Sequence, residues 1–326
     1  MKHLALIWPD GGTIISSMVL TAEVIDTANL YYRSKGKRPV FAVSIIGSRQ
    51  DQARRKGPFF IQPDKTLQET SHADLIIIPS LGYDIATALR QNAALIDWVT
   101  LQYKLGAEVA GLCTGTFILA AAGLLKGKQC STHWSFANTF HAMFPEVDLA
   151  IEKVITSSHG VYSSGGALSA MNLVLHIIEK YYDRETAIYC AKIFEIDPNR
   201  NDQSGFIIFS GQKNHEDNEI KKAQLFIEQN VESKIVIEEL SSQLAIERRS
   251  FDRRFKKATG NTPVEYMQRV KMEAAKKSFE TTRKTVNEVM YDVGYSDIKT
   301  FREVFKRITG ISPVAYRVKY NKEATL

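Results

Sequence analysis

The sequence holds 326 residues, 44% of them hydrophobic and 24% charged, with three cysteines and a net charge of +6. This composition excludes a disordered or collagen-like chain, and the length suits two ordinary domains. The longest apolar run, FILAAAGLL, is far below the roughly 20 residues that cross a bilayer. The cysteines form no CxxC pair, which fits a reducing compartment. We therefore expect a cytoplasmic protein without membrane contact, whose first residues form a β-strand rather than a signal peptide.

The net charge is unevenly distributed along the chain. Residues 1–216 hold 20 Lys and Arg and 20 Asp and Glu, whereas residues 217–326 hold 22 and 16 and so carry the whole excess. A basic excess at one end indicates a polyanionic partner for that end. A solvated helix surface rich in lysine gives the same totals, so the pattern of residues has to decide between the two.

Residues 1 to about 195 alternate between strand-like and helix-like segments. Four short apolar runs, LALIW, PVFAVSII, DLIIIPS and EVAGL, are typical of strands buried on both faces of a sheet. Helical patterns occur in VLTAEVIDTANLYYRS, IATALRQNAALIDWVTLQYK and RETAIYCAKIF. The alternation predicts an α/β domain over residues 1–196 with a mainly parallel sheet. A polar stretch with Pro198, Gly205 and Gly211 predicts a linker over residues 197–217.

The stretch EVAGLCTGTFILAAAGLL predicts a buried strand, a sharp turn at Cys113 and then a helix. Backbone N–H groups at the start of that helix lower the pKa of a thiol or bind an anion. Catalysis also needs a base that is held in place. The spacing forces no such partner, because His133 suits a cleft or a structural role, and His176 with Glu179 suits a packed helical histidine. The residues alone make a weak case for an enzyme.

The C-terminal part of the sequence contains a repeat. Residues 251–266, FDRRFKKATGNTPVEY, match residues 301–316, FREVFKRITGISPVAY, without a gap. Such self-similarity indicates a duplicated unit. In each copy a short helix, VIEELSSQLA or TVNEVMYDVGY, precedes a tight turn and a second helix with phenylalanines at positions i and i+4 on its buried face. Glycine and then proline follow each second helix, so two helix-turn-helix units are predicted.

The second helix of the first copy begins with ERRSFDRRFKK, which holds six basic and two acidic residues. Arg249 and Arg253 lie one turn apart, on the side away from Phe251 and Phe255. Arginine in that position can donate two hydrogen bonds to the O6 and N7 edge of guanine. The cations near the helix ends suit phosphates instead, and these residues are Lys256, Lys257, Lys306 and Arg307. A plain helical bundle with a basic surface is the alternative.

These motifs make residues 220–320 resemble the DNA-binding domain of the AraC/XylS family of bacterial transcription regulators. RRSFDRRFKKATGNTPVEY is similar to the family's first recognition helix and the segment after it, and VGYSDIKTFREVFKRITGISPVAYR is similar to its second signature. The resemblance implies a long helix over residues 263–280 that joins two units reaching major-groove segments about 34 Å apart. By position in the motif it assigns base contacts to Arg249, Asp252, Arg253, Lys299, Arg302 and Glu303. Glu303 is a departure, because that position is often basic or polar; an acid there can accept from cytosine N4.

Residues 1–195 resemble the PfpI-like, class I glutamine amidotransferase-like superfamily, whose flavodoxin-like α/β sandwich carries a cysteine at an elbow. Within it, CTGTFILAAAGLLKGKQCSTHW looks like the GlxA-like regulators, in which this domain precedes an AraC-type domain. In the superfamily's enzymes an acidic residue pairs with the cysteine, and a histidine often follows it. Here the acidic position falls near Ser17, and Thr114 follows Cys113. With both partners missing, we expect Cys113 to form the floor of a binding pocket.

The resemblance implies that the first domain senses a small metabolite, of amino-acid or quaternary-amine type. No metal or other cofactor is expected. Candidate ligand-binding residues are Trp8, Gly12, Tyr83, Cys113, Thr114, His133 and Trp134. Aromatic faces at the carboxyl edge of the sheet can hold a cation, although core packing explains each aromatic as well. An anion at the start of the helix after Cys113 is equally permitted.

The leading hypothesis is a transcription regulator, not an enzyme. It combines a flavodoxin-like effector-sensing domain over residues 1–196 with an all-α DNA-binding domain over residues 218–326. The expected partners are double-stranded DNA, the small effector, RNA polymerase and a second copy of the chain. Two alternatives stay open: a hydrolase or amidase with Cys113 as nucleophile and a DNA-binding tail, and a redox switch at the same thiol.

Overall fold

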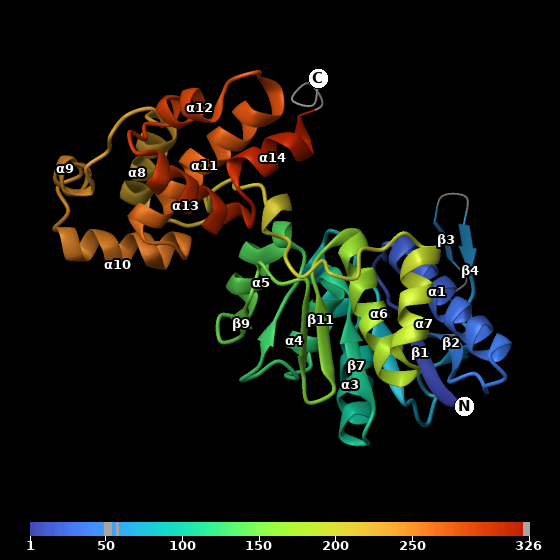
Figure 1. Cartoon of the computed structure of the whole chain (residues 1–326). Helices are drawn as coiled ribbons and strands as arrows, with labels where there is room; N and C mark the ends of the chain where they lie inside the picture. The colour runs from blue at the N-terminus through green and yellow to red at the C-terminus, as the bar shows by residue number, and fades with distance from the viewer. Residues whose placement is uncertain (49–53, 57–58, 322–326) are drawn as a thin grey trace. The chain divides into compact units, whose positions relative to one another are not determined.

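The computed structural model describes residues 1–48, 54–56 and 59–321. Contacts within the chain divide it into two compact units, which we call the N-terminal unit (Met1–Gln203) and the C-terminal unit (Ser204–Leu326). Figure 1 labels the elements of both and colours them along the chain. Among the described residues, no helix is long and apolar enough to cross a membrane.

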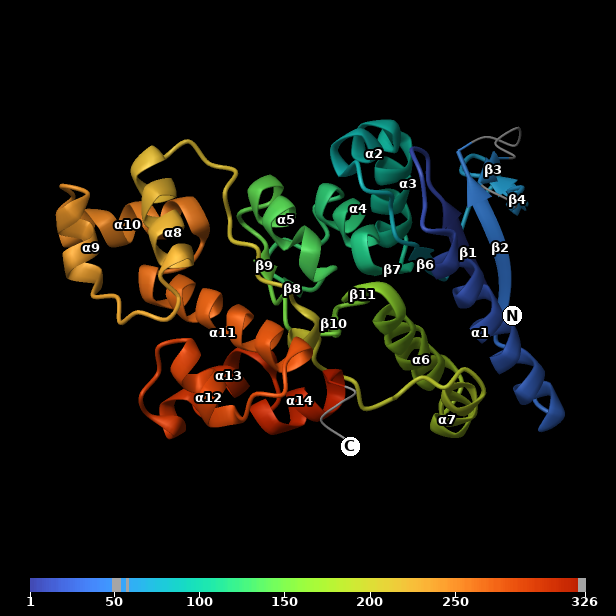
Figure 2. The same cartoon turned by 90° about the horizontal axis from the view of Figure 1, so that it is seen from above.

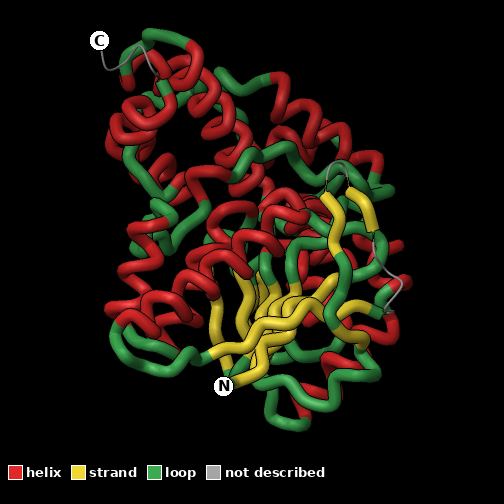
Figure 3. The backbone as a smooth tube through the Cα atoms, turned by 90° about the vertical axis from the view of Figure 1, so that its right-hand side faces the viewer, coloured by secondary structure: helices red, strands yellow, loops and turns green. Residues whose placement is uncertain are grey.

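The N-terminal unit is built around a seven-stranded sheet in the order β10-β11-β7-β6-β1-β2-β5. Its strands are β1 (Lys2–Trp8), β2 (Phe41–Gly47), β5 (Lys65–Thr66), β6 (Leu75–Ile78), β7 (Glu108–Gly111), β10 (Ile155–Ser158) and β11 (Val161–Ser164). Every neighbouring pair is parallel except β10 and β11. The four runs predicted as strands are β2, β1, β6 and β7, which lie side by side in the middle of the sheet. Figure 3, with strands in yellow, shows the sheet, and the predicted α/β class is confirmed.

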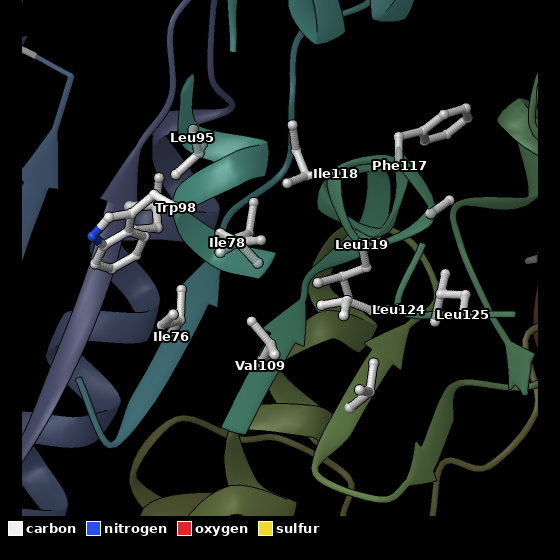
Figure 4. Packing of buried hydrophobic residues seen from close by; sticks show 14 of the residues in the cluster. Ile76, Ile78, Leu95, Trp98, Val109, Phe117, Ile118, Leu119, Leu124 and Leu125 are labelled. Atoms are coloured by element: carbon white, nitrogen blue, oxygen red, sulfur yellow. The ribbon is translucent and has the colours of Figure 1, made fainter. Parts of the chain in front are cut away.

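Helices cover both faces of this sheet (Figure 2). One face carries α1 (Ile15–Ser34), α6 (Ala170–Tyr181) and α7 (Arg184–Ile193), and the other carries α2 (Ile85–Gln91), α3 (Ala93–Lys104), α4 (Thr116–Ala121) and α5 (Ala137–Met143). A core lies on each face of the sheet, the first under α1, α6 and α7 and the second under α2 to α5. Side chains alternate along a strand, so Leu4 and Leu6 of β1 lie in the first core and Ala5 and Ile7 in the second. Figure 4 shows part of the second core, where residues of β6 and β7 meet residues of α3 and α4.

The helical pattern over residues 85–104 is confirmed and forms two helices, α2 and α3. Asn92 separates them and is 3% exposed. Its side-chain amide donates to the carbonyls of Ala88 and Asp10, and its side-chain oxygen accepts from the Asp10 amide. These contacts with the loop after β1 hold Asn92 outside both helices, and the sequence pattern gives no sign of this break.

The C-terminal unit contains helices and no strand over its described residues. Its helices are α8 (Asn218–Gln229), α9 (Ile237–Gln243), α10 (Arg248–Thr259), α11 (Pro263–Thr281), α12 (Val286–Asp292), α13 (Ile298–Thr309) and α14 (Pro313–Tyr320). Two cores form around the phenylalanine pairs of α10 and α13, and α11 contributes Tyr266 to one core and Phe279 to the other. The predicted helical domain with two helix-turn-helix units is confirmed. We call α9 with α10 the first repeat and α12 with α13 the second repeat.

The predicted linker over residues 197–217 contains one short 3-10 helix, η4 (Ser204–Phe206). Its first residues are bonded within the N-terminal unit, where the Asn172 side chain donates to the Asp197 carbonyl at 2.6 Å. Its later residues are bonded within the C-terminal unit, where the Phe209 and Tyr266 rings lie 5.1 Å apart. The chain therefore passes from one unit to the other inside this segment, between Gln203 and Ser204.

Candidate DNA interface and ligand site

The first repeat buries one face of α10 in the core of the C-terminal unit. Phe251 and Phe255 are 0% exposed, and the Phe255 ring lies 5.3 Å from the Tyr266 ring of α11. Gly260 follows α10 with φ of 72°, a left-handed conformation that glycine adopts without strain and that ends the helix. The packing fixes α10 along this face and leaves the opposite face to solvent.

The solvent face of α10 is basic. Its exposed cations are Arg249, Arg253, Lys256 and Lys257. The other two arginines are held in ion pairs, since Arg248 contacts Asp252 and Glu238 and Arg254 contacts Asp217. Arg248 Nε lies 3.1 Å from an Asp252 carboxylate oxygen, so this ion pair holds the Asp252 side chain along α10.

The second repeat has the same construction. Phe301 and Phe305 are 0% exposed, and Gly310 ends α13 with φ of 78°. The exposed charged residues of α13 are Lys299, Arg302, Glu303, Lys306 and Arg307. Arg307 is tied to α11, because its Nη2 donates to Gln268 Oε1 at 2.5 Å. Of the residues assigned to DNA from the sequence, Asp252 is partly buried and the others are exposed.

Each of these helices begins at a carboxylate that caps it. Glu247 accepts from the amides of Arg249 and Ser250, which lower the pKa of its carboxyl group. Asp297 accepts from the hydroxyl and the amide of Thr300, which lower its pKa in the same way. These amides are occupied by the caps. These amides are therefore not free to bind an anion, and the exposed polar groups of α10 and α13 are their side chains.

In the N-terminal unit, Cys113 lies at the turn between β7 and α4. Its φ of 55° is in the left-handed region, which residues other than glycine rarely adopt. The residue is 6% exposed. Its amide donates to Ser164 Oγ at 3.2 Å, and its carbonyl accepts from Thr132 Oγ1 at 2.9 Å. The predicted strand, sharp turn and helix are confirmed.

The polar groups around this turn are bonded to the fold rather than to the thiol. Ser17, where the resemblance expects an acid, is buried, and its Oγ accepts from the Ser80 amide at 3.0 Å. Thr114 donates its hydroxyl to the Leu81 carbonyl at 3.0 Å. Within the part of the chain that the structure describes, no histidine or carboxylate forms a hydrogen bond with the Cys113 sulfur.

His133 follows Thr132 and is half-buried. Its Nδ1 lies 2.8 Å from Ser135 Oγ, and its ring packs on Gly166, where a Cβ atom would lie 2.0 Å from ring carbon Cδ2. Burial lowers the pKa of His133, which favours the neutral form of its ring. His176 lies on α6, as the helical pattern predicts; its side chain is exposed, and its ring lies 6.0 Å from the Tyr162 ring.

Two of the aromatic candidates gather around Phe136, together with His133. Tyr83 stacks on Phe136 with ring centroids 6.2 Å apart, and Phe136 meets the His133 ring edge-on at 6.2 Å. The His133 and Trp134 rings lie 5.4 Å apart. We call these four residues the aromatic cluster. Phe136 was not among the sequence candidates, and its place one residue beyond the HWS motif is the only signal that could have singled it out.

Tyr83 and Trp8 differ in their exposure. Tyr83 is 84% exposed, so the core interpretation of this side chain is wrong. Trp8 is 4% exposed and lies in the core with α1 and α6. Its indole N–H has no hydrogen-bond partner among the described residues. Gly12 has φ of 109°, and its carbonyl accepts from the Gly82 amide at 2.9 Å, which joins the loops after β1 and β6.

The remaining thiols and acids offer no second centre. Cys130 and Cys190 are 0% exposed, and burial raises their pKa values to about 12 and about 11. Over the described ranges, no group of three or more His, Cys, Asp and Glu side chains could hold a metal ion. Cys113 is thus the most exposed of the three cysteines.

Comparison with known proteins identifies both parts of the chain. Residues 18–180 match the DJ-1/PfpI family, and residues 240–319 match a helix-turn-helix domain. The chain is 24% identical over 254 residues to the HTH-type transcriptional regulator GbdR of Pseudomonas aeruginosa, a match that covers 78% of this chain and 68% of that protein. It is 22% identical over 227 residues to the HTH-type transcriptional regulator GlxA of Rhizobium meliloti, with 66% of each chain covered.

A solved structure extends the match to the fold. The N-terminal part is similar to a protein from Vibrio parahaemolyticus that is named as a transcriptional regulator, with a TM-score of 0.53 and 25% identity over 59% of this chain and 98% of that one. In this chain the segment that matches the DJ-1/PfpI family precedes the helix-turn-helix segment. The chain belongs to the DJ-1/PfpI family and joins its DJ-1/PfpI domain to an AraC-type helix-turn-helix domain.

Proposed function

We propose that this AraC-type transcription regulator binds specific DNA sequences with both repeats and is controlled by a small metabolite bound in its DJ-1/PfpI domain. One observation carries the DNA part: α10 and α13 each bury a phenylalanine pair and present exposed cations on the opposite face. A helix fixed in this way can enter a major groove with its polar face forward.

The exposed positions divide into two roles. Residues in the first two turns of the helices face base edges, and we assign them to Arg249, Asp252, Arg253, Lys299, Arg302 and Glu303. The cations in the last turns meet phosphates, and we assign this role to Lys256, Lys257, Lys306 and Arg307. Phosphate contacts release counterions, so binding should weaken steeply as salt rises.

The test of specific binding removes the two arginines of the first repeat. In the full chain, Arg249→Ala combined with Arg253→Ala should lower affinity for a selected duplex about 100-fold, because each bidentate contact with guanine contributes about 1–3 kcal/mol. Affinity for random duplex should fall far less. Lys221→Ala with Lys222→Ala is the matched control, since it removes the same charge from exposed positions of α8. Equal losses in both double variants would show that the arginines act only through net charge.

For the metabolite we propose a site between the Cys113 turn and the aromatic cluster. The turn supplies buried hydroxyls, and the cluster supplies ring faces that can hold a cation such as an amine or a quaternary ammonium group. A ligand changes DNA binding only if it prefers one of two conformations of the chain. We propose that the segment 197–217 is the joint between them, and that a second copy of the chain and RNA polymerase complete the assembly.

A ligand screen tests this site. All three tryptophans lie in the N-terminal unit, so fluorescence follows the unfolding of that unit within the full chain. An amine or amino acid that binds only the folded unit raises its melting temperature. The increase should be lost in Tyr83→Ala and Trp134→Ala and kept in Tyr103→Ala, which changes an aromatic outside the cluster. An increase that both cluster variants keep would place the ligand elsewhere.

An enzyme with Cys113 as nucleophile is the second candidate, favoured by the left-handed turn at that residue. We propose that the thiol is not catalytic, because neither an acid nor a histidine among the described residues is bonded to it. Alkylation by iodoacetamide at neutral pH should be slow. Rapid and stoichiometric alkylation of Cys113, with hydrolysis abolished by Cys113→Ser, would instead support the enzyme.

A further inference from the structure

A buried lysine connects the two repeats. Lys271 lies in the middle of α11 and is 4% exposed. Its Nζ donates to the carbonyls of Val231, Ser233 and Val293 at 2.5, 3.0 and 2.8 Å. An ammonium group has three N–H donors, so all of them are satisfied. A charge is buried at this depth only where such partners compensate for the lost water, and burial lowers the pKa of Lys271 to about 8.

The three carbonyls come from segments that precede and follow α11 in the chain. Val231 and Ser233 lie in the loop between α8 and α9, which leads into the first repeat. Val293 follows α12 in the turn of the second repeat. One ammonium group therefore holds the loop that leads into the first repeat and the turn of the second repeat at the same point.

Two further contacts join the same segments. A Cβ atom on Gly294 would lie 2.4 Å from the Glu232 carbonyl oxygen, so the two backbones touch where the second repeat has a glycine with φ of 68°. The Val231 side chain packs against the core that contains Phe301 and Phe305 of the second repeat. The loop is thus fixed to the second repeat by apolar packing as well as by the lysine.

We propose that Lys271 is a positioning residue for DNA recognition, which locks the two repeats at one mutual angle and so sets the base-pair spacing between their half-sites. The proposal rests on the proposed function, because it requires both repeats to contact one duplex. Adding one base pair rotates the far half-site by about 34° and moves it by about 3.4 Å along the axis. A locked pair of recognition helices cannot follow that change without losing contacts at one half-site.

The chain supplies a matched control for this lysine. Lys276 lies on the same helix and is also 4% exposed. It donates to the Ile207 carbonyl and to Glu273, and neither partner belongs to a repeat. Lys276→Met therefore removes a buried ammonium group from α11 and leaves the contacts between the repeats in place.

The experiment measures how strongly binding depends on spacing. Full-length wild type, Lys271→Met and Lys276→Met are titrated at neutral pH and fixed salt with a duplex that the wild type selects from a random pool. The same duplex with one base pair inserted between the half-sites is the second probe. Insertion should cost the wild type and Lys276→Met about tenfold or more in affinity. Lys271→Met should bind the parent duplex more weakly and lose less than about threefold on insertion.

Three results would overturn the lock. Lys271→Met and wild type could show the same ratio of affinities for the two duplexes, or Lys276→Met could lose its spacing preference as fully as Lys271→Met. If Lys271→Met fails to fold, as judged by circular dichroism, Val231→Ala takes its place. The third result is then a ratio of affinities for the two duplexes in Val231→Ala that equals the wild-type ratio. Failure of the proposed function is a separate result, in which the wild type selects no duplex.

A second measurement needs no DNA. Amide hydrogen exchange in the free full chain reports the opening of the turn at Gly294 and of the loop at Glu232. Both should exchange faster in Lys271→Met than in Lys276→Met, because only the first variant leaves their neighbouring carbonyls without a donor. Equal exchange in the two variants would contradict the lock.

Discussion

The two repeats of the C-terminal unit carry the same charges at three exposed positions and exchanged charges at two others. With an offset of 50 residues, the matching cations are Arg249 and Lys299, Lys256 and Lys306, and Lys257 and Arg307. Between them, Asp252 and Arg253 of the first repeat stand where the second repeat has Arg302 and Glu303. The acidic residue therefore precedes the arginine in α10 and follows it in α13.

This difference separates two kinds of contact. The cations near the helix ends suit phosphates, which are the same at every site, so both repeats can keep them. The exchanged pair lies at positions that face base edges, where arginine suits guanine and a carboxylate suits the cytosine amino group. We expect the two half-sites to differ in sequence while their phosphate contacts remain alike.

The turns of the repeats also differ. Helices α9 and α12 begin 49 residues apart, whereas α10 and α13 begin 50 residues apart, so the second turn is one residue longer. Both turns contain a left-handed residue, which is Ala245 with φ of 53° in the first repeat and Gly294 with φ of 68° in the second. Gly294 lies against the backbone of Glu232, whereas Ala245 is exposed. The left-handed position is therefore an alanine in the turn where its side chain is exposed, and a glycine in the turn where a Cβ atom would meet the Glu232 backbone.

The largest effect is expected for Gly294→Ala. The new Cβ would lie 2.4 Å from the Glu232 carbonyl oxygen and 2.7 Å from Lys271 Nζ, in a backbone conformation that alanine adopts with strain. Strain and overpacking together should lower the free energy of unfolding of the C-terminal unit by about 3 kcal/mol. Circular dichroism of the helices measures this in the full chain, and tryptophan fluorescence of the N-terminal unit is the internal control. An unchanged helical transition would contradict the close contact.

The second effect concerns the exchanged pair. Asp252→Arg combined with Arg253→Glu gives α10 the order found in α13. Affinity for the parent duplex should fall about 30-fold, since a guanine contact is replaced by a carboxylate. Selection from a random pool should then return a first half-site that resembles the second. A variant that selects the parent sequence would show that these two positions do not read bases.

A smaller effect is expected at the phosphate positions. Lys256→Ala and Lys306→Ala should each weaken binding roughly threefold to tenfold, by the same factor for every duplex sequence. Each should also reduce the salt dependence by about one counterion. A change in sequence preference in either variant would instead place that lysine at a base.

The smallest effect is expected for Ala245→Gly. Glycine relieves the left-handed conformation at this residue and adds entropy to the unfolded chain, so the two effects partly cancel. The C-terminal unit should gain about 0.5 kcal/mol of stability. Loss of stability in the same denaturation experiment would mean that the alanine methyl group makes a contact worth more than the strain.

The sequence predicts most of the fold, because buried parallel strands and amphipathic helices leave clear patterns. Strands β10 and β11 lack such a pattern, since ITSS and VYSS are mostly polar. The break at Asn92 arises from hydrogen bonds with a distant loop. Such contacts between segments far apart in the chain leave no local signal.

The candidate sites divide in the same way. The exposed cations of α10 and α13 follow from helical spacing around the phenylalanines, so the sequence finds them. Lys271 lies in the polar run RVKMEAAKK and reads as a surface lysine. Its burial depends on two loops that meet over α11. Phe136 is similar, since its role depends on Tyr83, which is distant in the chain.

The central claim is that both repeats read one duplex. Selection of random duplex DNA by the full chain at moderate salt, followed by footprinting of the enriched sequence, tests it most directly. The account predicts two unlike protected segments on the same face of the duplex, about 34 Å apart, as expected for major grooves one helical turn apart. A pool without an enriched sequence, or a footprint limited to one segment that remains when α13 loses Lys299 and Arg302, would contradict it.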